Sequence, residues 1–514
     1  MGRAVKKLLE RSNRKIGRPS MKKILYAMIS ILFVSLFLSC SMGEEDNNES
    51  SGGNTPKTNS DVLIMMYLDG DNNLNDTSWK NLYDTQVGLM NLRGETTINV
   101  LALIDGNADC AQKYQTDGKT YLYKVGALTS EEAEDSNIIV GKSTLNYSKS
   151  TSWVYNGSGT ATQEVDMSNA KTLYNFLNWA NTNFTADKKI LIFHNHGGGP
   201  YNELTSCLEI QDAARSICYD DTNRKGSNFY LSTKDISLAI QKTFGKVDLI
   251  VEDVCLECSI EEVYGLQDAT NYLIASPNST ITNSYNYDLI IPYISTGASI
   301  VDIGKRFVDY NMEKCRYTTT RGADTKSNDP TCMELSLTLV DCSKKTELAE
   351  IKNLTSNLAE QLLADSTNKD FYTNNLIGKL YYKKNYFCGF SFDTTYLYTQ
   401  DLGVMAYLLA YKSTGIADKV KTAAASLYNK LHDSGLIVYG WSGGKEHDWY
   451  YSGNSSYGNL DFLKITDGKC AWGISITSGR RFPKISLADY SSWSEFGKDN
   501  KWADLLVEWK NTVE

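Results

Sequence analysis

The sequence predicts an α/β protein with a mostly parallel sheet and helices on both faces, followed by a smaller α+β C-terminal part. Short apolar, β-branched runs alternate along the chain with helical patterns, which is typical of a parallel sheet covered on both faces. Two of these runs, at 190–193 and 247–251, are almost entirely apolar, as expected for buried strands. The chain has 514 residues, 41% of them hydrophobic, which is enough for a large core and two compact parts.

The order of the elements follows from these runs, beginning at Asp61. Ser168 can cap a helix that continues to residue 179. The polar stretch 131–159 predicts an exposed insertion. The other expected elements of the first part are strands at 62–68, 98–105, 121–126, 190–193 and 247–251, and helices at 79–91 and 300–310.

Pro330 marks the expected end of the core, which divides the folded chain into 61–330 and 331–514. The second part continues the alternation of strands and helices. Its expected elements are a strand at 333–340, helices at 345–365, 401–410 and 416–431, and late strands at 436–439 and 470–477.

A cysteine follows one of the two buried strands. The run 247–251 stops at Glu252-Asp253, and Cys255 comes next, before a helical pattern. Reactive groups of α/β proteins lie in the crevice at the carboxyl ends of the strands. A buried structural cysteine is the alternative, because a free thiol packs like a small hydrophobe.

Two of the four histidines of the chain follow the other buried strand. The run 190–193 ends in His194-Asn-His196 and is followed by three glycines, 197–199. Glycines leave backbone N–H groups accessible to a substrate carbonyl. Parallel strands that end in histidine and in cysteine would bring imidazole and thiol to one sheet edge, which suits activation of the thiol.

Histidine-glycine after one strand and Asp-x-Cys after a later one resemble the clan of cysteine peptidases that includes caspases, legumain, gingipains and clostripain. The chain is most similar to the clostripain-like family, peptidase family C11, over roughly residues 60 to 514. The resemblance implies a caspase-like fold and cleavage of polypeptides. The segments that carry it are 62–74, 170–184, 196–199, 219–222, 253–256, 261–263, 272–276, 473–476 and 490–509.

The resemblance assigns the catalytic roles to a dyad. Cys255 would attack the scissile carbonyl, and His196 would supply the proton to the leaving amine. The backbone N–H groups of Gly197 and Cys255 would hold the oxyanion. His194 competes as the base, since in a strand it would point the same way as His196. The family motif, histidine directly before glycine, favours His196.

The family's preference for Arg or Lys before the cut implies an acidic S1 pocket. Asp253, two residues before Cys255, matches this pocket, and a carboxylate there can pair with a guanidinium in a bidentate manner. Asp71 and Asn72 match the family's acidic loop and would contribute. The alternative is that Asp253 only caps the helix after Cys255.

The family often matures by internal cleavage after a basic residue between its histidine and cysteine strands. Arg215-Ser216 is the expected site, and Arg224 and Lys225 are the next candidates. Pro200 and Glu257 depart from the family pattern, which leaves the subsite preferences open.

Residues 1–40 have the pattern of a signal peptide, with Met21 as an alternative start before two lysines and an apolar run. Its end, Phe37-Leu-Ser-Cys40, resembles a lipobox, so we expect a lipid on Cys40. Residues 41–60 are polar and predict a flexible tether. We therefore expect an exported lipoprotein of a Gram-negative bacterium, on the periplasmic side of the outer membrane or at the cell surface. An uncleaved anchor or soluble secretion is the alternative.

Composition limits the possible partners. A net charge of −9 argues against nucleic acid, which needs a basic surface. Cys255-x-x-Cys258 has no second pair or neighbouring histidine, so no metal site is expected. We expect that no cofactor is required. Some relatives use calcium, so binding of Ca²⁺ remains an open alternative. No contiguous loop of the sequence has the spacing of an EF-hand. The protein is expected to be a monomer.

Two other functions compete with the peptidase. Gly440-Trp-Ser-Gly-Gly444, with His447 nearby, fits the serine esterase motif, but the residues after it are too polar and too rich in glycine for the helix that this motif requires. The second is a lipoprotein with a peptidase-like fold that binds peptide or glycan without catalysis, suggested by the 33 tyrosines.

Overall fold

The strand β1 (Thr58–Gly70) lies inside the main sheet and pairs in parallel with β2 (Ile98–Gly106) and β5 (Phe184–His194). The computed structural model describes residues 57–107, 120–129, 146–147, 164–199, 217–218, 220–222, 230–277, 280, 285–317, 336–372, 399–442, 473–477 and 490–510.

The described part of the sheet has nine strands in the order β10-β8-β7-β6-β5-β1-β2-β3-β4. The five from β7 to β2 are parallel, and the strands added at both edges are antiparallel, which confirms the expected mostly parallel sheet. The remaining strands are β3 (Tyr121–Lys124), β4 (Asn146–Tyr147), β6 (Val247–Asp253), β7 (Thr270–Ala275), β8 (Ser336–Asp341) and β10 (Ile437–Ser442).

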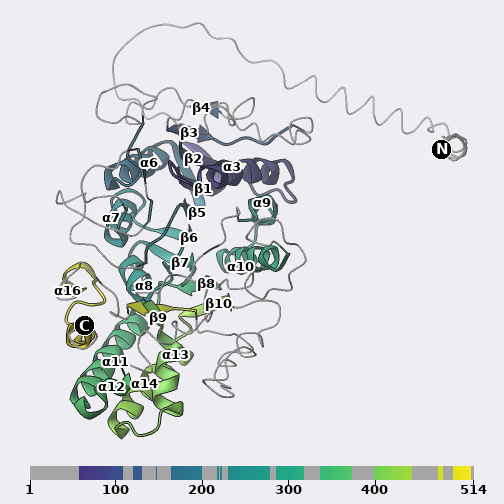
Figure 1. Cartoon of the computed structure of the whole chain (residues 1–514). Helices are drawn as coiled ribbons and strands as arrows, with labels where there is room; N and C mark the ends of the chain where they lie inside the picture. Colours follow the sequence, from purple (N-terminus) through teal and green to yellow (C-terminus); the bar gives the residue numbers. More distant parts are fainter. Residues whose placement is uncertain are drawn as a thin grey trace, which may run out of the picture. The chain divides into compact units, whose positions relative to one another are not determined.

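The strands alternate their apolar side chains between two hydrophobic cores because successive residues point to opposite faces. In β1, Leu63, Met65 and Tyr67 belong to one core, and Ile64 and Met66 belong to the other. Figure 1 shows helices on both sides of the sheet. These are α6 (Ala170–Asn183), α7 (Thr233–Thr243) and α8 (Ile260–Leu266) on the first core, and α3 (Asn75–Met90), α9 (Tyr287–Ile294) and α10 (Ile300–Tyr317) on the second.

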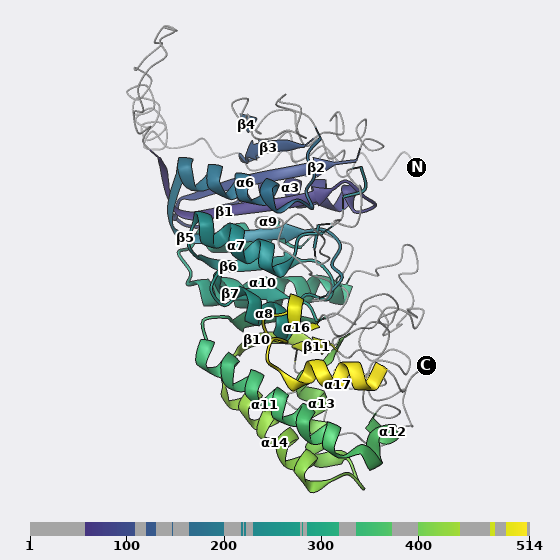
Figure 2. The same ribbon diagram turned by 90° about the vertical axis from the view of Figure 1, so that its left-hand side faces the viewer.

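The C-terminal part adds β8 and β10 to the same sheet and places helices beside it. Figure 2 shows α11 (Lys345–Ala364) alongside α14 (Asp418–Asp433), with α17 (Lys501–Lys510) also packed on α11. β9 (Thr399–Asp401) and β11 (Ser475–Thr477) form a separate antiparallel pair. Shorter helical elements are Ser366–Asn368, α12 (Lys369–Phe371), α13 (Leu402–Tyr407), Leu408–Lys412 and α16 (Tyr490–Trp493).

This C-terminal part forms hydrogen bonds with the segment that follows Cys255. The N–H of Ser475 donates to the carbonyl of Cys258 at 2.9 Å, and the thiol of Cys258 donates to the carbonyl of Gly473 at 3.2 Å. The side chain of Glu261 accepts from the N–H of Thr477 at 2.9 Å and from the hydroxyl of Tyr490 at 2.8 Å. The late strand therefore supports the loop that leads from β6 into α8.

The expected helix cap at Ser168 was wrong. The cap of α6 is Asn169, whose side chain accepts from the N–H of Lys171 at 2.9 Å, whereas the hydroxyl of Ser168 bonds to Asp166. Cys258 is buried and lies before the start of α8. Pro330 and most of the stretch 131–159 lie outside the described residues, so the boundary at 330 stays a prediction. In the described ranges, no helix combines the length and hydrophobicity needed to cross a membrane.

Candidate active site

β5, which ends at His194, and β6, which ends at Glu252-Asp253, are neighbours in the sheet. β5 and β6 are parallel, and His194 at the end of β5 lies opposite Asp253 at the end of β6. Because the carboxyl ends of parallel strands meet at one edge, the turns that follow them lie next to each other.

Gly197 and Cys255 bring the backbones of these two turns into close contact. A Cβ atom at Gly197 would lie 2.0 Å from the carbonyl oxygen and 2.9 Å from the nitrogen of Cys255. Such distances leave no room for any side chain, so the first glycine after His196 is required by the contact. The histidine turn therefore lies directly against the backbone of the cysteine.

Cys255 is half-buried, and within the described part of the chain its thiol is in no disulfide. The backbone N–H of Thr280 donates to its Sγ atom at 3.2 Å, which favours the thiolate because the donor faces the developing charge. Leu256 has φ of 68°, a left-handed conformation that a branched side chain rarely adopts. The turn thus carries local strain of about 1–3 kcal/mol next to the thiol.

His196 is also half-buried, and its Nε2 atom lies 2.7 Å from Oδ1 of Asn73. An Nε2–H that donates to this oxygen leaves Nδ1 as the unprotonated nitrogen of a neutral imidazole. Burial lowers the pKa of His196 below its ordinary value, and the neighbouring His194 lowers it further. The imidazole is thereby kept in the form that can accept a proton at neutral pH.

His194 has a different environment. It is buried, and its Nδ1 lies 3.1 Å from Oδ2 of Asp253. The expectation that the two histidines point the same way was wrong, because β5 ends at His194 and His196 lies in the turn beyond it.

Asp253 is held by groups from three elements. Besides His194, its Oδ2 accepts from Nδ2 of Asn81 at 3.2 Å and contacts the hydroxyl of Tyr287 at 3.5 Å. Asp253 does not cap the next helix, because Ser259 caps α8 through the N–H of Glu262. The alternative explanation for this aspartate is therefore excluded.

Glu257 organises the glycine turn. Its buried carboxylate accepts the N–H groups of Gly198 and Gly199 through Oε1, at 3.1 and 3.0 Å. Hydrogen bonds from N–H groups to a carboxylate are stronger than those to a neutral oxygen. The residue that departs from the family pattern thus ties the two turns together.

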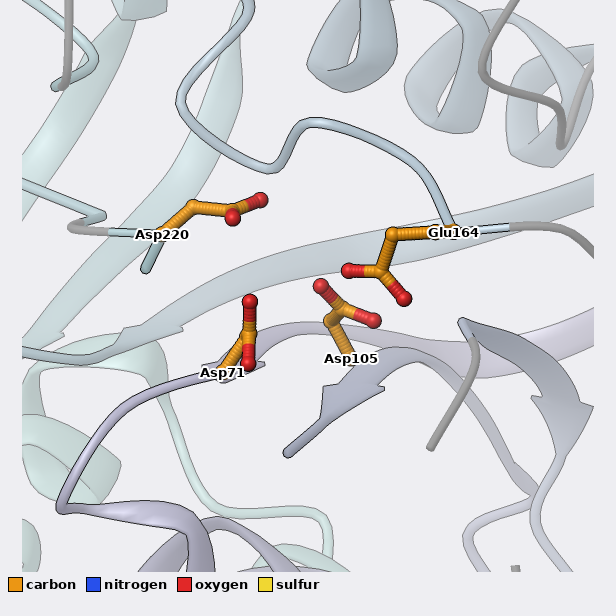
Figure 3. A group of neighbouring side chains, drawn as sticks. All are labelled: Asp71, Asp105, Glu164 and Asp220. Carbon is orange, nitrogen blue, oxygen red and sulfur yellow. The ribbon is translucent and has the colours of Figure 1, made fainter. Parts of the chain in front are cut away.

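The side chains of the acidic loop after β1 have different hydrogen-bond partners from Asp253. Asp71 accepts the N–H of Thr222 at 2.6 Å and its side chain is directed toward other carboxylates (Figure 3). Asn72 accepts the N–H of Leu74 at 2.8 Å. Arg215, Ser216 and Cys40 lie outside the described residues.

Several partners of His196, Cys255 and Asp253 could not be identified from the sequence. Asn73 belongs to the segment 62–74 that carries the family resemblance, but nothing in the local sequence links it to His196. Thr280, Asn81 and Tyr287 come from separate elements that only the folded chain brings to the site. Glu257 was noticed only as a departure from the family pattern.

A family model described as the clostripain family matches residues 66–509. The chain belongs to the clostripain family. It is therefore a cysteine peptidase, a hydrolase of the C11 type. The family match covers both turns of the candidate site and the C-terminal elements that support them.

Individual members of the clostripain family resemble the chain over most of its length. Clostripain from Hathewaya histolytica is 24% identical over 509 residues, which cover 88% of this chain and 87% of that protein. Two solved structures share the fold at 15% identity. The secreted C11 cysteine protease iotapain from Bacteroides thetaiotaomicron has a TM-score of 0.50 and covers 86% of this chain and 99% of its own. An inactive zymogen C11 protease from Parabacteroides distasonis has a TM-score of 0.51, with 88% and 99% covered.

Proposed function

We propose that this clostripain-family chain is an endopeptidase that cleaves after Arg or Lys through Cys255 and His196. The observation that carries the proposal is the backbone contact between Gly197 and Cys255, which fixes the histidine turn against the cysteine turn. The exposure of the two side chains also favours this pair, because His196 and Cys255 are half-buried whereas His194 is buried against Asp253. A base must reach both the thiol and the substrate.

The proposed reaction begins with proton transfer from Sγ of Cys255 to Nδ1 of His196. The thiolate attacks the scissile carbonyl, and the N–H groups of Gly197 and Cys255 hold the oxyanion, each such donor being worth about 3 kcal/mol. The C–N bond then breaks as His196 returns the proton to the amine. Water activated by His196 hydrolyses the thioester. Gly198 and Gly199 donate to Glu257, so they position the turn instead of holding the oxyanion.

Asp253 is the proposed acidic residue of the S1 pocket. Its contacts within the described chain all involve Oδ2, so Oδ1 is the oxygen that a substrate guanidinium or ammonium would meet. Pairing with a cation compensates a buried carboxylate. Asn72 and Asp71 were expected to contribute, but Asn72 accepts the N–H of Leu74 in its own loop, and Asp71 accepts the N–H of Thr222 and faces other carboxylates. We therefore rest the specificity on Asp253.

The dyad chemistry needs no cofactor, because thiol, imidazole and backbone N–H groups supply nucleophile, base and oxyanion donors. A calcium ion would act on the scaffold and not on the reacting atoms. The substrates are polypeptides, in keeping with the family.

Maturation and location complete the proposal. The chain is a zymogen that cleaves itself after Arg215, acts as a monomer, and is exported as a lipoprotein anchored through Cys40. The outer membrane of a Gram-negative bacterium is the proposed location, on its periplasmic side or at the cell surface. A Cys255→Ala protein that is still cut between Arg215 and Ser216 would show that another protease does the processing.

Fluorogenic peptides that end in Arg, Lys, Asp or Asn test the function directly. The protein beginning at Ser41 should cleave the Arg and Lys peptides, and the Cys255→Ala protein should cleave none. Absence of cleavage by protein already cut after Arg215 would overturn the proposal in favour of a peptide-binding or glycan-binding lipoprotein.

A further inference from the structure

The imidazole of His196 needs more than a fixed backbone to serve as a base. The contact of Gly197 with Cys255, and the hydrogen bonds that Glu257 accepts from the next two glycines, hold the backbone of the histidine turn. These contacts do not involve the imidazole, so they leave its side-chain torsions free to change. A partner on the ring itself is needed to direct one nitrogen toward the thiol.

Asn73 supplies such a partner. Its Oδ1 atom lies 2.7 Å from Nε2 of His196. An amide oxygen can only accept a hydrogen bond, so Nε2 carries the proton in this contact. Nδ1 is then the unprotonated nitrogen, which is the one that takes the proton of Cys255 in the proposed reaction. A hydrogen bond at one ring nitrogen in this way fixes both the tautomer and the orientation of the ring.

The loop that carries Asn73 is itself fixed on both sides. The N–H of Asn72 donates to the carbonyl of Gly70 at 2.7 Å, and Oδ1 of Asn72 accepts the N–H of Leu74 at 2.8 Å. The helix α3 begins directly after Leu74. The exposed side chain of Asn73 therefore extends from a backbone that lies between a side-chain-stabilised turn and the start of a helix.

A second set of hydrogen bonds joins this loop to the histidine turn. Nδ2 of the buried Asn195 donates to the carbonyl of Asp69 at 2.7 Å, and Oδ1 of Asn195 accepts the N–H of His196. β1 and β5 pair in parallel up to the residues just before these two segments. The position of Asn73 relative to His196 is therefore set by strand pairing and by Asn195 as well as by the contact at the ring.

We propose that Asn73 is the positioning residue of the dyad, so that Cys255, His196 and Asn73 act as a triad. This inference rests on the proposed function of the dyad. Asn73 touches no reacting atom and acts only through the imidazole. Thiol, imidazole and amide are combined in the same order in papain-like proteases, which have an unrelated fold. Because an amide carries no charge, Asn73 orients the ring without raising the pKa of His196, which burial and His194 lower.

Kinetics of Asn73→Ala and Asn73→Asp in the full-length enzyme, with an Arg peptide as substrate, test the proposal. Asn73→Ala removes the partner of the ring, so kcat should fall at least about tenfold while KM stays within about twofold. Asn73→Asp keeps an oxygen near Nε2 and should retain kcat within a few-fold at alkaline pH. Its added charge favours the imidazolium, so the acid limb of kcat/KM should move up by about 1 pH unit.

The design isolates the effect of position 73. His194 and Asp221 also act on the pKa of His196, and both variants leave them unchanged. Asn178→Ala and Asn178→Asp are the matched controls, because Asn178 is an exposed asparagine in the half of α6 that leads to the start of β5, whereas His196 follows the end of β5. Neither control should change kcat or the acid limb, and all four variants should melt within a few degrees of the parent.

A kcat of Asn73→Ala within about threefold of the parent would overturn the role of Asn73. A higher KM with unchanged kcat would overturn it too, and would make Asn73 a substrate contact. A lower melting temperature in both variants at residue 73, with an unmoved acid limb for Asn73→Asp, would make Asn73 only a structural part of its loop. Cleavage of the same peptide by the Cys255→Ala protein would instead overturn the dyad, and the triad with it.

Discussion

The backbone of Gly197 lies so close to Cys255 that a Cβ atom would come within 2.0 Å of the cysteine carbonyl oxygen. Gly197→Ala must therefore push the histidine turn away from the cysteine turn. A displacement of about 1 Å at reacting groups can cost about a hundredfold in rate, so we expect kcat/KM for an Arg peptide to fall at least about a hundredfold.

Gly440→Ala in β10 is the control, because its Cβ would lie 3.3 Å from the nearest atom, the carbonyl oxygen of Leu337. It should keep most of the activity. Turnover by Gly197→Ala within a few-fold of the parent would show that the contact does not position the dyad.

Glu257 should contribute to stability through the glycine turn. Glu257→Ala removes the acceptor of two N–H groups, that of buried Gly199 and that of half-buried Gly198, at about 1–3 kcal/mol for each buried group. We expect a loss of about 2–4 kcal/mol in the free energy of unfolding, measured with denaturant in the Cys255→Ala background.

Glu257→Gln retains an acceptor oxygen and should lose less than half as much. Glu360→Ala on the exposed side of α11 should be nearly neutral. Equal losses for the alanine and glutamine variants would argue that the charge of Glu257, and not its hydrogen bonds, is what matters.

Asp253→Asn should change specificity more than stability. The substitution keeps the size of the side chain but removes the charge that would pair with a substrate cation. The ratio of kcat/KM for an Arg peptide to that for a matched Gln peptide should fall at least about tenfold, with the melting temperature changed by only a few degrees. An unchanged ratio accompanied by a large fall in melting temperature would make Asp253 a structural partner of His194 only.

The pH dependence should report the lowered pKa of His196. The proposed base works as neutral imidazole, so activity is lost as pH falls through this pKa and the base becomes protonated. Because burial and His194 lower the pKa, the acid limb of kcat/KM should lie below about pH 6.5, the ordinary value for histidine. Melting curves over the same range separate this limb from unfolding. A limb clearly above 6.5 would contradict the assignment.

The fold could be predicted because its buried strands carry a strong local signal. The runs 190–193 and 247–251 predicted two parallel strands whose ends carry the candidate dyad, and the structure has both, as the neighbouring strands β5 and β6. Boundaries were less accurate, because caps such as Asn169 and Ser259 depend on local geometry that several polar residues could supply.

The surroundings of the candidate site could not be predicted from the sequence. Asn73 and Thr280 meet their partners only through tertiary packing of distant segments. The same limitation affected the two histidines. The alternation of side chains along a strand predicted that both point the same way, but β5 ends at His194, and each histidine has a separate partner.

The central claim is that His196, and not His194, is the base for Cys255. The most direct test is turnover of an Arg peptide by His196→Ala and His194→Ala, with the melting temperature of each variant measured in parallel. We expect His196→Ala to lose at least about a hundredfold in kcat with an unchanged melting temperature, and His194→Ala to retain measurable turnover despite lower stability, because it removes a buried partner of Asp253. Activity that survives His196→Ala but disappears in a folded His194→Ala protein would contradict the account.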